Sequence, residues 1–301
     1  MTNSRHRAGR HRAGVFFAIV TAMFLGVITT QAKFVYQHGG NALTLMTVRF
    51  AVTSLVVGLI LLVLRMKRGS DAGNKNRSEN TKLTIITGAT WSLAMICYLL
   101  SVQYMSVSIA ALVLFTFPLM ILLVSLFLGT IRFSWILLSL FVMAFIGLGF
   151  ALLSGQLVSN PLGIGLALLA AVGACITFFT GARVSQQVDP LTLVFQVSII
   201  GLILAVPLVW QNFSLPDAAG YLPLAGATTC YILAIICQFN ALGRLAPAMV
   251  GFVMNLEPVI SILAARVMLH ETLGTLQWLG IAMVLAALFL SAKLLTPQPS
   301  N

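Results

Sequence analysis

The sequence predicts an all-α membrane protein of ten transmembrane helices, arranged as two inverted repeats of five helices with both termini in the cytoplasm. Hydrophobic residues make up 59% of the 301 residues and charged residues only 8%, whereas a typical soluble domain has about 25% charged residues. The mean hydropathy is +1.03. Apolar runs long enough to cross a bilayer as a helix recur along the whole chain.

Apolar runs and helix-breaking residues place the individual elements. The expected spans are 15–33, 43–64, 83–104, 107–128, 134–153, 162–183, 191–210, 221–242, 247–269 and 275–294. They divide the chain into a basic cytoplasmic N-terminus (1–14), a first five-helix repeat (15–153), an external linker (154–161), a second five-helix repeat (162–294) and a cytoplasmic tail (295–301).

Basic residues collect on one side of the predicted membrane. All but three of the 17 Lys and Arg fall on the side of the N-terminus; Lys33 lies on the other side, and Arg49 and Arg266 lie within spans. Cytoplasmic loops carry an excess of Lys and Arg. The net charge of +11 therefore indicates the orientation of a multi-pass membrane protein, which we expect in the inner membrane of a bacterium, and no nucleic-acid partner is expected.

The two halves of the chain correspond to each other. When Cys237 is placed on Cys97, Pro258 falls on Pro118, and the hydropathy of the two halves stays in step. Because five is an odd number of spans, the second copy enters the membrane from the opposite side. Such inverted repeats are typical of transporters that bind their substrate near the bilayer midplane.

The segment APAMVGFVMNLEPVISILAARVMLHETLGTLQWLGIAMVLAALFL (246–290) resembles the closing part of the EamA-type transporters of the drug/metabolite transporter (DMT) superfamily. Its marks are small residues, a Glu-Pro-Val step, and a Glu-Thr-Leu turn before QWLGIAMVLA. LMTVRF and SIAALVLFTFPLMILLVSLFLG in the first half are similar, so the resemblance covers nearly the whole chain. It implies export of small metabolites or drugs, often amino acids, as in the aromatic amino-acid and threonine/homoserine exporters.

Four residues on equivalent helices are candidates for a substrate path. Trp91 and Tyr98 are seven residues apart and so share a helix face, and their equivalents in the second repeat are Tyr231 and Gln238. We predict that all four line the path, because an exporter of aromatic or neutral solutes needs an apolar surface with a few polar groups. Alternatively, Trp91 and Tyr231 belong to the aromatic belts at the membrane surface.

Glu257 lies near the centre of a predicted span, where an ionised carboxylate costs at least about 2.5 kcal/mol. It must face water, find a donor or stay protonated. The functional interpretations are binding of a substrate amine and proton exchange; the structural one is hydrogen bonding to neighbouring helices. Asn255 lies about 200° around the helix from Glu257, so we expect only one of the two to be in the path.

Three further residues are candidates for binding or movement. Arg49 either binds a substrate carboxylate or fixes neighbouring helices, and the second interpretation is favoured. Pro118 and Pro258 are candidate hinges, since each lacks a backbone donor and would free the carbonyl of Leu114 or Met254. Matched kinks could form two gates or could only shape the packing.

The sequence contains no HExxH, GxSxG or ATP-binding motif and no cluster of His and Cys. We therefore expect neither an enzyme nor a metal or cofactor. The expected function is a secondary transporter that exports small metabolites, above all aromatic or neutral amino acids, by alternating access. The alternatives are drug or cation efflux and a flippase for a lipid-linked carrier. Proton coupling stays open, and a single protomer could form the complete pathway.

Overall fold

The structure is a computed structural model that describes residues 2–68, 77–131, 133–153, 159–270 and 272–295. All regular secondary structure in these residues is helical, which confirms the all-α fold class. Most of the predicted linker 154–161 and of the predicted tail 295–301 lies outside the described residues.

The helices coincide with the predicted spans, but α1 begins at Thr2, within the segment 1–14 that was predicted as a separate N-terminus. In chain order they are α1 (Thr2–Gln37), α2 (Ala42–Arg68), α3 (Arg77–Ser101), α4 (Val107–Leu114), α5 (Phe117–Phe127), α6 (Trp135–Leu152), α7 (Pro161–Val184), α8 (Pro190–Val209), the 3₁₀ turn η1 (Ala218–Gly220), α9 (Tyr221–Leu242), α10 (Pro247–Val253), α11 (Leu256–Met268) and α12 (Thr275–Leu295). Within the described ranges, 9 helical segments are long and apolar enough to cross a membrane, and Thr275–Ser291 forms a shorter apolar helix.

The fourth and ninth spans are interrupted, whereas the sequence predicted continuous helices with kinks. α4 gives way to α5 at Phe115–Thr116, and α10 gives way to α11 at Met254–Asn255. Pro118 and Pro258 each lie in the first turn of the second helix, where proline is tolerated because the first N–H groups of a helix lack intrahelical acceptors. The expectation of a free Met254 carbonyl is wrong, because this carbonyl accepts the N–H of Glu257 at 3.0 Å.

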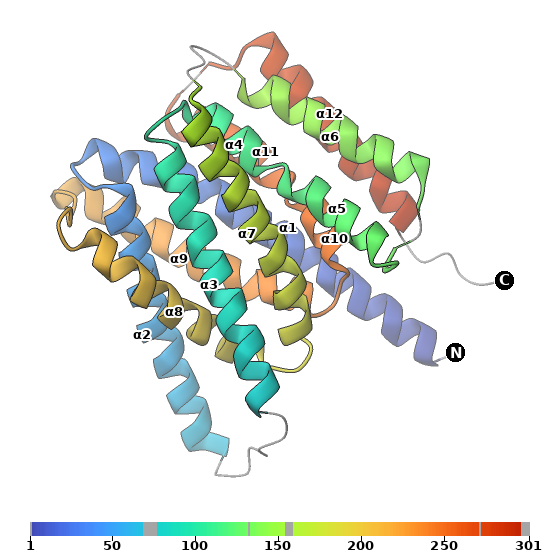
Figure 1. Ribbon diagram of the computed structural model, residues 1–301, viewed down its shortest axis with the longest axis horizontal. Helices are drawn as coiled ribbons and strands as arrows, with labels where there is room; N and C mark the ends of the chain where they lie inside the picture. The colour runs from blue at the N-terminus through green and yellow to red at the C-terminus, as the bar shows by residue number, and fades with distance from the viewer. Residues whose placement is uncertain (1, 69–76, 132, 154–158, 271, 296–301) are drawn as a thin grey trace.

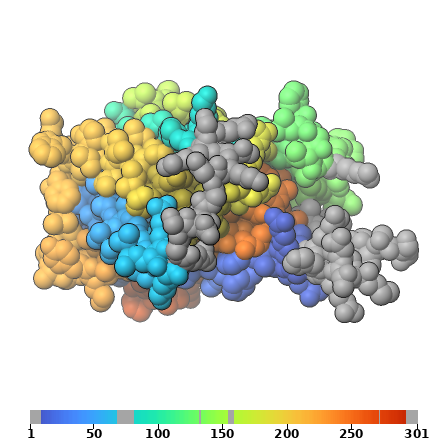
Figure 2. Space-filling model, turned by 90° about the horizontal axis from the view of Figure 1, so that it is seen from below, coloured from blue at the N-terminus to red at the C-terminus, as the bar shows by residue number. Residues whose placement is uncertain are grey.

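The two repeats pack against each other through equivalent pairs of helices. α1 packs along α9, and α7, the equivalent of α1, packs along α3. Equivalent helices also pack against each other: α2 against α8, and α6 against α12, the pair along the upper right edge of Figure 1. Figure 2 shows the blue of α1 against the orange of the second repeat on the lower face. The interior is therefore built jointly by both repeats.

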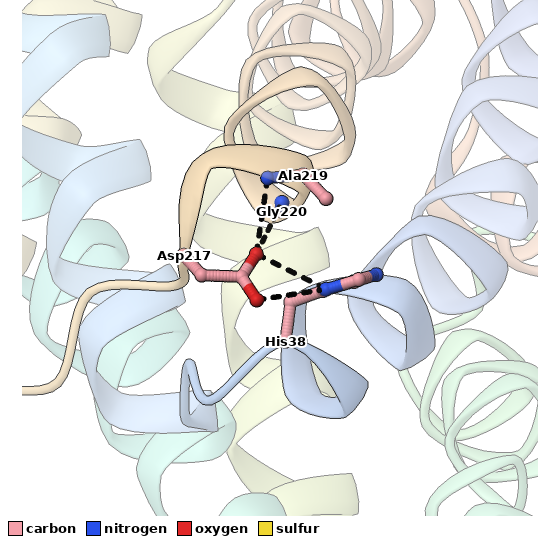
Figure 3. A network of polar contacts seen from close by, with 4 residues as sticks. All are labelled: His38, Asp217, Ala219 and Gly220. Atoms are coloured by element: carbon pink, nitrogen blue, oxygen red, sulfur yellow. Dashed lines mark hydrogen bonds and ion pairs between the residues drawn. The ribbon is translucent and has the colours of Figure 1, made fainter.

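A polar clasp connects the α1–α2 turn to η1 (Figure 3). His38 Nδ1 lies 3.1 and 3.2 Å from the two carboxylate oxygens of Asp217, whose own N–H donates to the His38 carbonyl at 2.9 Å. Asp217 Oδ1 also accepts the N–H groups of Ala219 and Gly220. The hydrogen bond with His38 is the main cause that lowers the pKa of Asp217, and these backbone N–H groups lower it further.

Candidate functional site

A cavity of about 300 Å³ lies between the repeats. It reaches from the interior of the bundle towards its distal end, which we define as the end that carries the α1–α2 turn, where the half-exposed Tyr36 and Val107 line it. Of the residues predicted for the path, those that line this cavity are Arg49, Trp91, Tyr98, Tyr231, Gln238, Glu257 and Pro258. Asn255 and Pro118 lie outside its lining.

Trp91 and Tyr231 meet inside the bundle. The indole Nε1 of Trp91 donates a hydrogen bond of 3.1 Å to the Tyr231 hydroxyl, and the two residues are only 5% and 4% exposed. The ring of Phe50 stands edge-on to that of Tyr231, with 6.0 Å between centroids. Burial between helices of both repeats is inconsistent with aromatic belts at the membrane surface.

Arg49 projects from α2 into the same cavity. Its guanidinium carbon lies 5.0 Å from the centroid of the Tyr231 ring, a distance at which a cation is attracted to the face of the ring. Among the described residues, Arg49 Nε has no hydrogen-bond partner although it is buried, and no carboxylate forms an ion pair with the guanidinium. Arg49 therefore presents a cation to the cavity that an anionic group of a ligand could bind.

Glu257 lies in the first turn of α11, directly after the break in the span. The partial positive charge of a helix N-terminus favours a carboxylate there, which explains how an acid is tolerated at this depth. In the described part of the chain no group donates a hydrogen bond to this carboxylate. The equivalent residue in α5 is Phe117, which packs against Phe178 at 5.3 Å. The break in the second repeat is thus followed by an acid, and the equivalent break in the first repeat by an aromatic ring.

The structure separates Asn255 from Glu257. Asn255 is 3% exposed, and its Nδ2 donates to the carbonyl of Phe252 at 2.8 Å, so the side chain closes the end of α10. Only Glu257 lines the cavity. Gln238 also lines it, and its Oε1 is buried without a hydrogen-bond partner among the residues described. This oxygen is a second acceptor available to a ligand.

Some lining residues were missed by the sequence analysis. Thr29 and Ser261 line the cavity and share a hydrogen bond between α1 and α11. Ser261 follows Glu257 by one helical turn and so could have been found from the face they share. Tyr36 and Thr29 lie on α1, where no acid or repeat-matched aromatic residue marked one face.

At the opposite end of the bundle, where α1 begins, arginine side chains make contacts near the end of α9. Arg10 Nη2 donates to the carbonyl of Gly243 at 2.8 Å. Arg244 Nη1 donates to both oxygens of Asn240 at 2.7 Å, and its guanidinium lies over the ring of Phe17 at 5.0 Å. The Arg10 and Phe17 contacts join the first half of α1 to the end of α9, and none of the residues in them lines the cavity.

The fold and the site define a membrane transporter built from two helical repeats. A family model described as the EamA-like transporter family matches residues 12–153 and 161–293, which are the two repeats. The chain therefore belongs to the EamA-like transporter family. It is a multi-pass protein of the bacterial inner membrane and a transporter, not an enzyme.

Several proteins are similar to this chain. The threonine/homoserine exporter RhtA of Salmonella typhimurium strain SL1344 is 30% identical over 212 residues, which cover 67% of this chain and 68% of that protein. RhtA of Escherichia coli strain K12 is 30% identical over 200 residues, 63% of this chain and 64% of that one. A crystal structure of another protein matches with a TM-score of 0.78 over 93% of this chain and 98% of that chain, at 15% identity, a likeness of fold alone.

Proposed function

We propose that this chain exports small neutral amino acids and binds each one as a zwitterion between Arg49 and Glu257. The observation that carries the proposal is a cation and an acid that line one cavity without an ion pair between them among the described residues. An amino acid offers an α-carboxylate to the guanidinium and an α-ammonium group to the carboxylate. Unpaired charges in a membrane interior are costly, so both groups are best explained by a ligand of this kind.

The same pair of charges disfavours the alternative functions. An organic cation would meet Glu257 but would be repelled by Arg49. A lipid-linked phosphate carrier would meet Arg49 but would be repelled by Glu257. A zwitterion satisfies both groups, because it carries one charge of the opposite sign for each of them and has no net charge of its own.

The remaining lining favours a hydroxylated substrate. The cavity of about 300 Å³ is at the small end of the usual range for ligand pockets, roughly 300–1,000 Å³. The unsatisfied Oε1 of Gln238 can accept a hydrogen bond from a side-chain hydroxyl. The similar exporters act on threonine and homoserine by their names, and both carry such a hydroxyl. Aromatic amino acids are the second candidate, because Phe50, Phe115 and Phe178 also line the cavity.

The proposed mechanism is alternating access between two states. With the N-terminus in the cytoplasm, as the basic residues predict, the distal end, towards which the cavity reaches, faces outward, and the arginine contacts between α1 and α9 lie on the inner side. The packing of α1 on α9 is equivalent to that of α7 on α3. An exchange of these two arrangements would open the inner side and close the outer one.

Proton coupling follows from the single carboxylate. Glu257 cannot hold a proton and bind an ammonium group at the same time, so a proton taken up from outside would release the amino acid there. Return of the protonated carrier would bring one proton inward for each amino acid exported. An inward proton gradient would then drive export.

The test is transport by purified protein in liposomes. Wild type, Glu257→Gln and the exposed-surface control Ser139→Ala would be compared for efflux of labelled threonine, homoserine and phenylalanine, with and without a pH gradient. We expect wild type and Ser139→Ala to show gradient-driven efflux of threonine and homoserine. Glu257→Gln should keep exchange at high substrate concentration but lose the response to the gradient. Absence of amino-acid flux in the wild type would refute the proposal, and an unchanged gradient response in Glu257→Gln would refute the coupling.

A further inference from the structure

A second concave site lies on the side of the bundle, separate from the substrate cavity. It is a groove of about 470 Å³ between α1 and α12, with α10 and the first turn of α11 as its floor. We call it the lateral groove and define it by six of its lining residues: Val15, Ile19, Val253, Leu256, Leu285 and Phe289. On its rim Ile19, Leu285 and Phe289 are 38%, 43% and 63% exposed. Since they belong to membrane helices, this surface faces lipid.

The chemistry of the lateral groove changes along its length. His11 and Arg12 line one end, at the start of α1, and the walls beyond them are apolar. Arg12 is exposed, and His11 Nε2 is buried without a hydrogen-bond partner in the described part of the structure. From His11 to Ile19 the helix rises about 12 Å. A charged end followed by an apolar channel of this depth matches a phospholipid with its headgroup at the membrane surface.

We propose that the lateral groove binds one anionic phospholipid, with the headgroup phosphate at Arg12 and His11 and one acyl chain along the channel. Basic pockets between transmembrane helices on the cytoplasmic side attract anionic headgroups. A second copy of the chain fits less well, because a helix about 10 Å wide is too bulky for a groove of about 470 Å³. The charge at one end selects an anionic lipid over a zwitterionic one.

The lateral groove and the substrate cavity lie on opposite sides of the break between α10 and α11. Leu256 lines the groove and the next residue, Glu257, lines the cavity. Val253, the last residue of α10, also lines the groove. A lipid chain therefore packs against the outer side of the same broken segment whose inner side carries the acid.

The test is native mass spectrometry of the full chain purified with phosphatidylglycerol or phosphatidylcholine added. We expect the wild type to retain one phosphatidylglycerol in preference to phosphatidylcholine. Removing Arg12 and His11 together (both to Ala) should weaken this retention roughly fivefold or more, the factor expected from the loss of one arginine at the membrane surface. Arg183→Ala, which removes an exposed cation at the same end of the bundle but outside the groove, should leave it unchanged.

A second variant separates the channel from general surface charge. Val15→Trp fills the groove and leaves Arg12 and His11 in place, so it should also lose the retained phosphatidylglycerol. Equal retention of the two lipids, retention unaffected by the Arg12 and His11 substitutions, or loss in Arg183→Ala of the same size would each overturn the proposal. A dimer that carries no lipid would instead assign the groove to a second copy.

Discussion

Trp91 and Tyr231 occupy the same position in the two repeats and are joined by a hydrogen bond of 3.1 Å from Trp91 Nε1 to the Tyr231 hydroxyl. The bond crosses the interface between the repeats, and both residues line the cavity. Arg49 lies over the ring of the same Tyr231. One tyrosine thus contacts the equivalent helix of the other repeat and the cation proposed to bind substrate, so repeat packing and substrate binding share a residue.

Loss of the Tyr231 hydroxyl should destabilise the protein by leaving the buried Trp91 N–H without an acceptor. We expect Tyr231→Phe to cost about 1–3 kcal/mol, measured by thermal unfolding in detergent. Trp91→Phe combined with Tyr231→Phe should cost less than the sum of the single changes, because no unpaired group remains. Tyr221→Phe removes an exposed hydroxyl from the same helix and serves as the control. Fully additive effects would show that the bond contributes nothing.

Arg49 should be the cause of any preference of the transporter for substrates that carry a carboxylate. We expect Arg49→Gln to raise the KM for amino acids about tenfold or more, since a hydrogen bond to a charged group contributes about 1.5–3 kcal/mol. It should also remove the preference for an amino acid over the corresponding amine that lacks the carboxylate. Arg49→Lys should fall between, because lysine keeps the charge but not the planar fork. The measurement is competition by both compounds in the liposome exchange assay.

A different result for Arg49 would support the helix-fixing interpretation. If Arg49→Gln lowered the melting temperature while the KM and the preference for the carboxylate stayed the same, the guanidinium would serve the packing of α2 on Tyr231. Wild-type stability with a raised KM would support substrate binding.

The pairing of α6 with α12 depends on two glycines. A Cβ placed on Gly280 would collide with the carbonyl of Gly147 and lie 2.5 Å from the backbone N of Ala151. Because both are backbone atoms, relief requires the helices to move apart. We expect Gly280→Ala to cost about 1–3 kcal/mol, read as a lower melting temperature. Gly149→Ala is the matched control, since a Cβ there meets no described atom within 4 Å. Equal melting temperatures for both variants would contradict this.

Hydropathy and the internal repeat were sufficient to predict ten spans, because length and apolarity decide what can cross a bilayer. The internal repeat also predicted that Trp91 and Tyr231 occupy equivalent positions. The break before Glu257 could not be predicted, since a proline in a long apolar run is compatible with either a kink or a restarted helix. The lining of α1 was missed for a related reason: a span that is apolar all round does not show which face meets a cavity.

The clasp between His38 and Asp217 should give the distal loops an acid-dependent stability. The pKa of Asp217 is lowered, mainly by the hydrogen bond with His38, so the folded state favours the charged carboxylate. The resulting stability is complete above the pKa that Asp217 has in the unfolded chain, and it is lost as the pH falls through the lowered pKa of the folded state. The dependence is therefore confined to the acid side of the ordinary aspartate pKa.

Removing either partner should weaken this acid-dependent stability. We expect His38→Ala to raise the pKa of Asp217 towards its ordinary value, so that unfolding on acidification begins at a higher pH than in the wild type. Asp217→Asn should keep the cap on η1 but flatten the pH dependence. Asp189→Asn, which changes a capping carboxylate at the start of α8, is the control. Melting temperatures between pH 2 and 6, on the acid side set by the lowered pKa, would decide. If His38→Ala and the wild type gave the same curve, the contact would be too weak in solution to stabilise the carboxylate, because an exposed pair contributes little once solvent screens it.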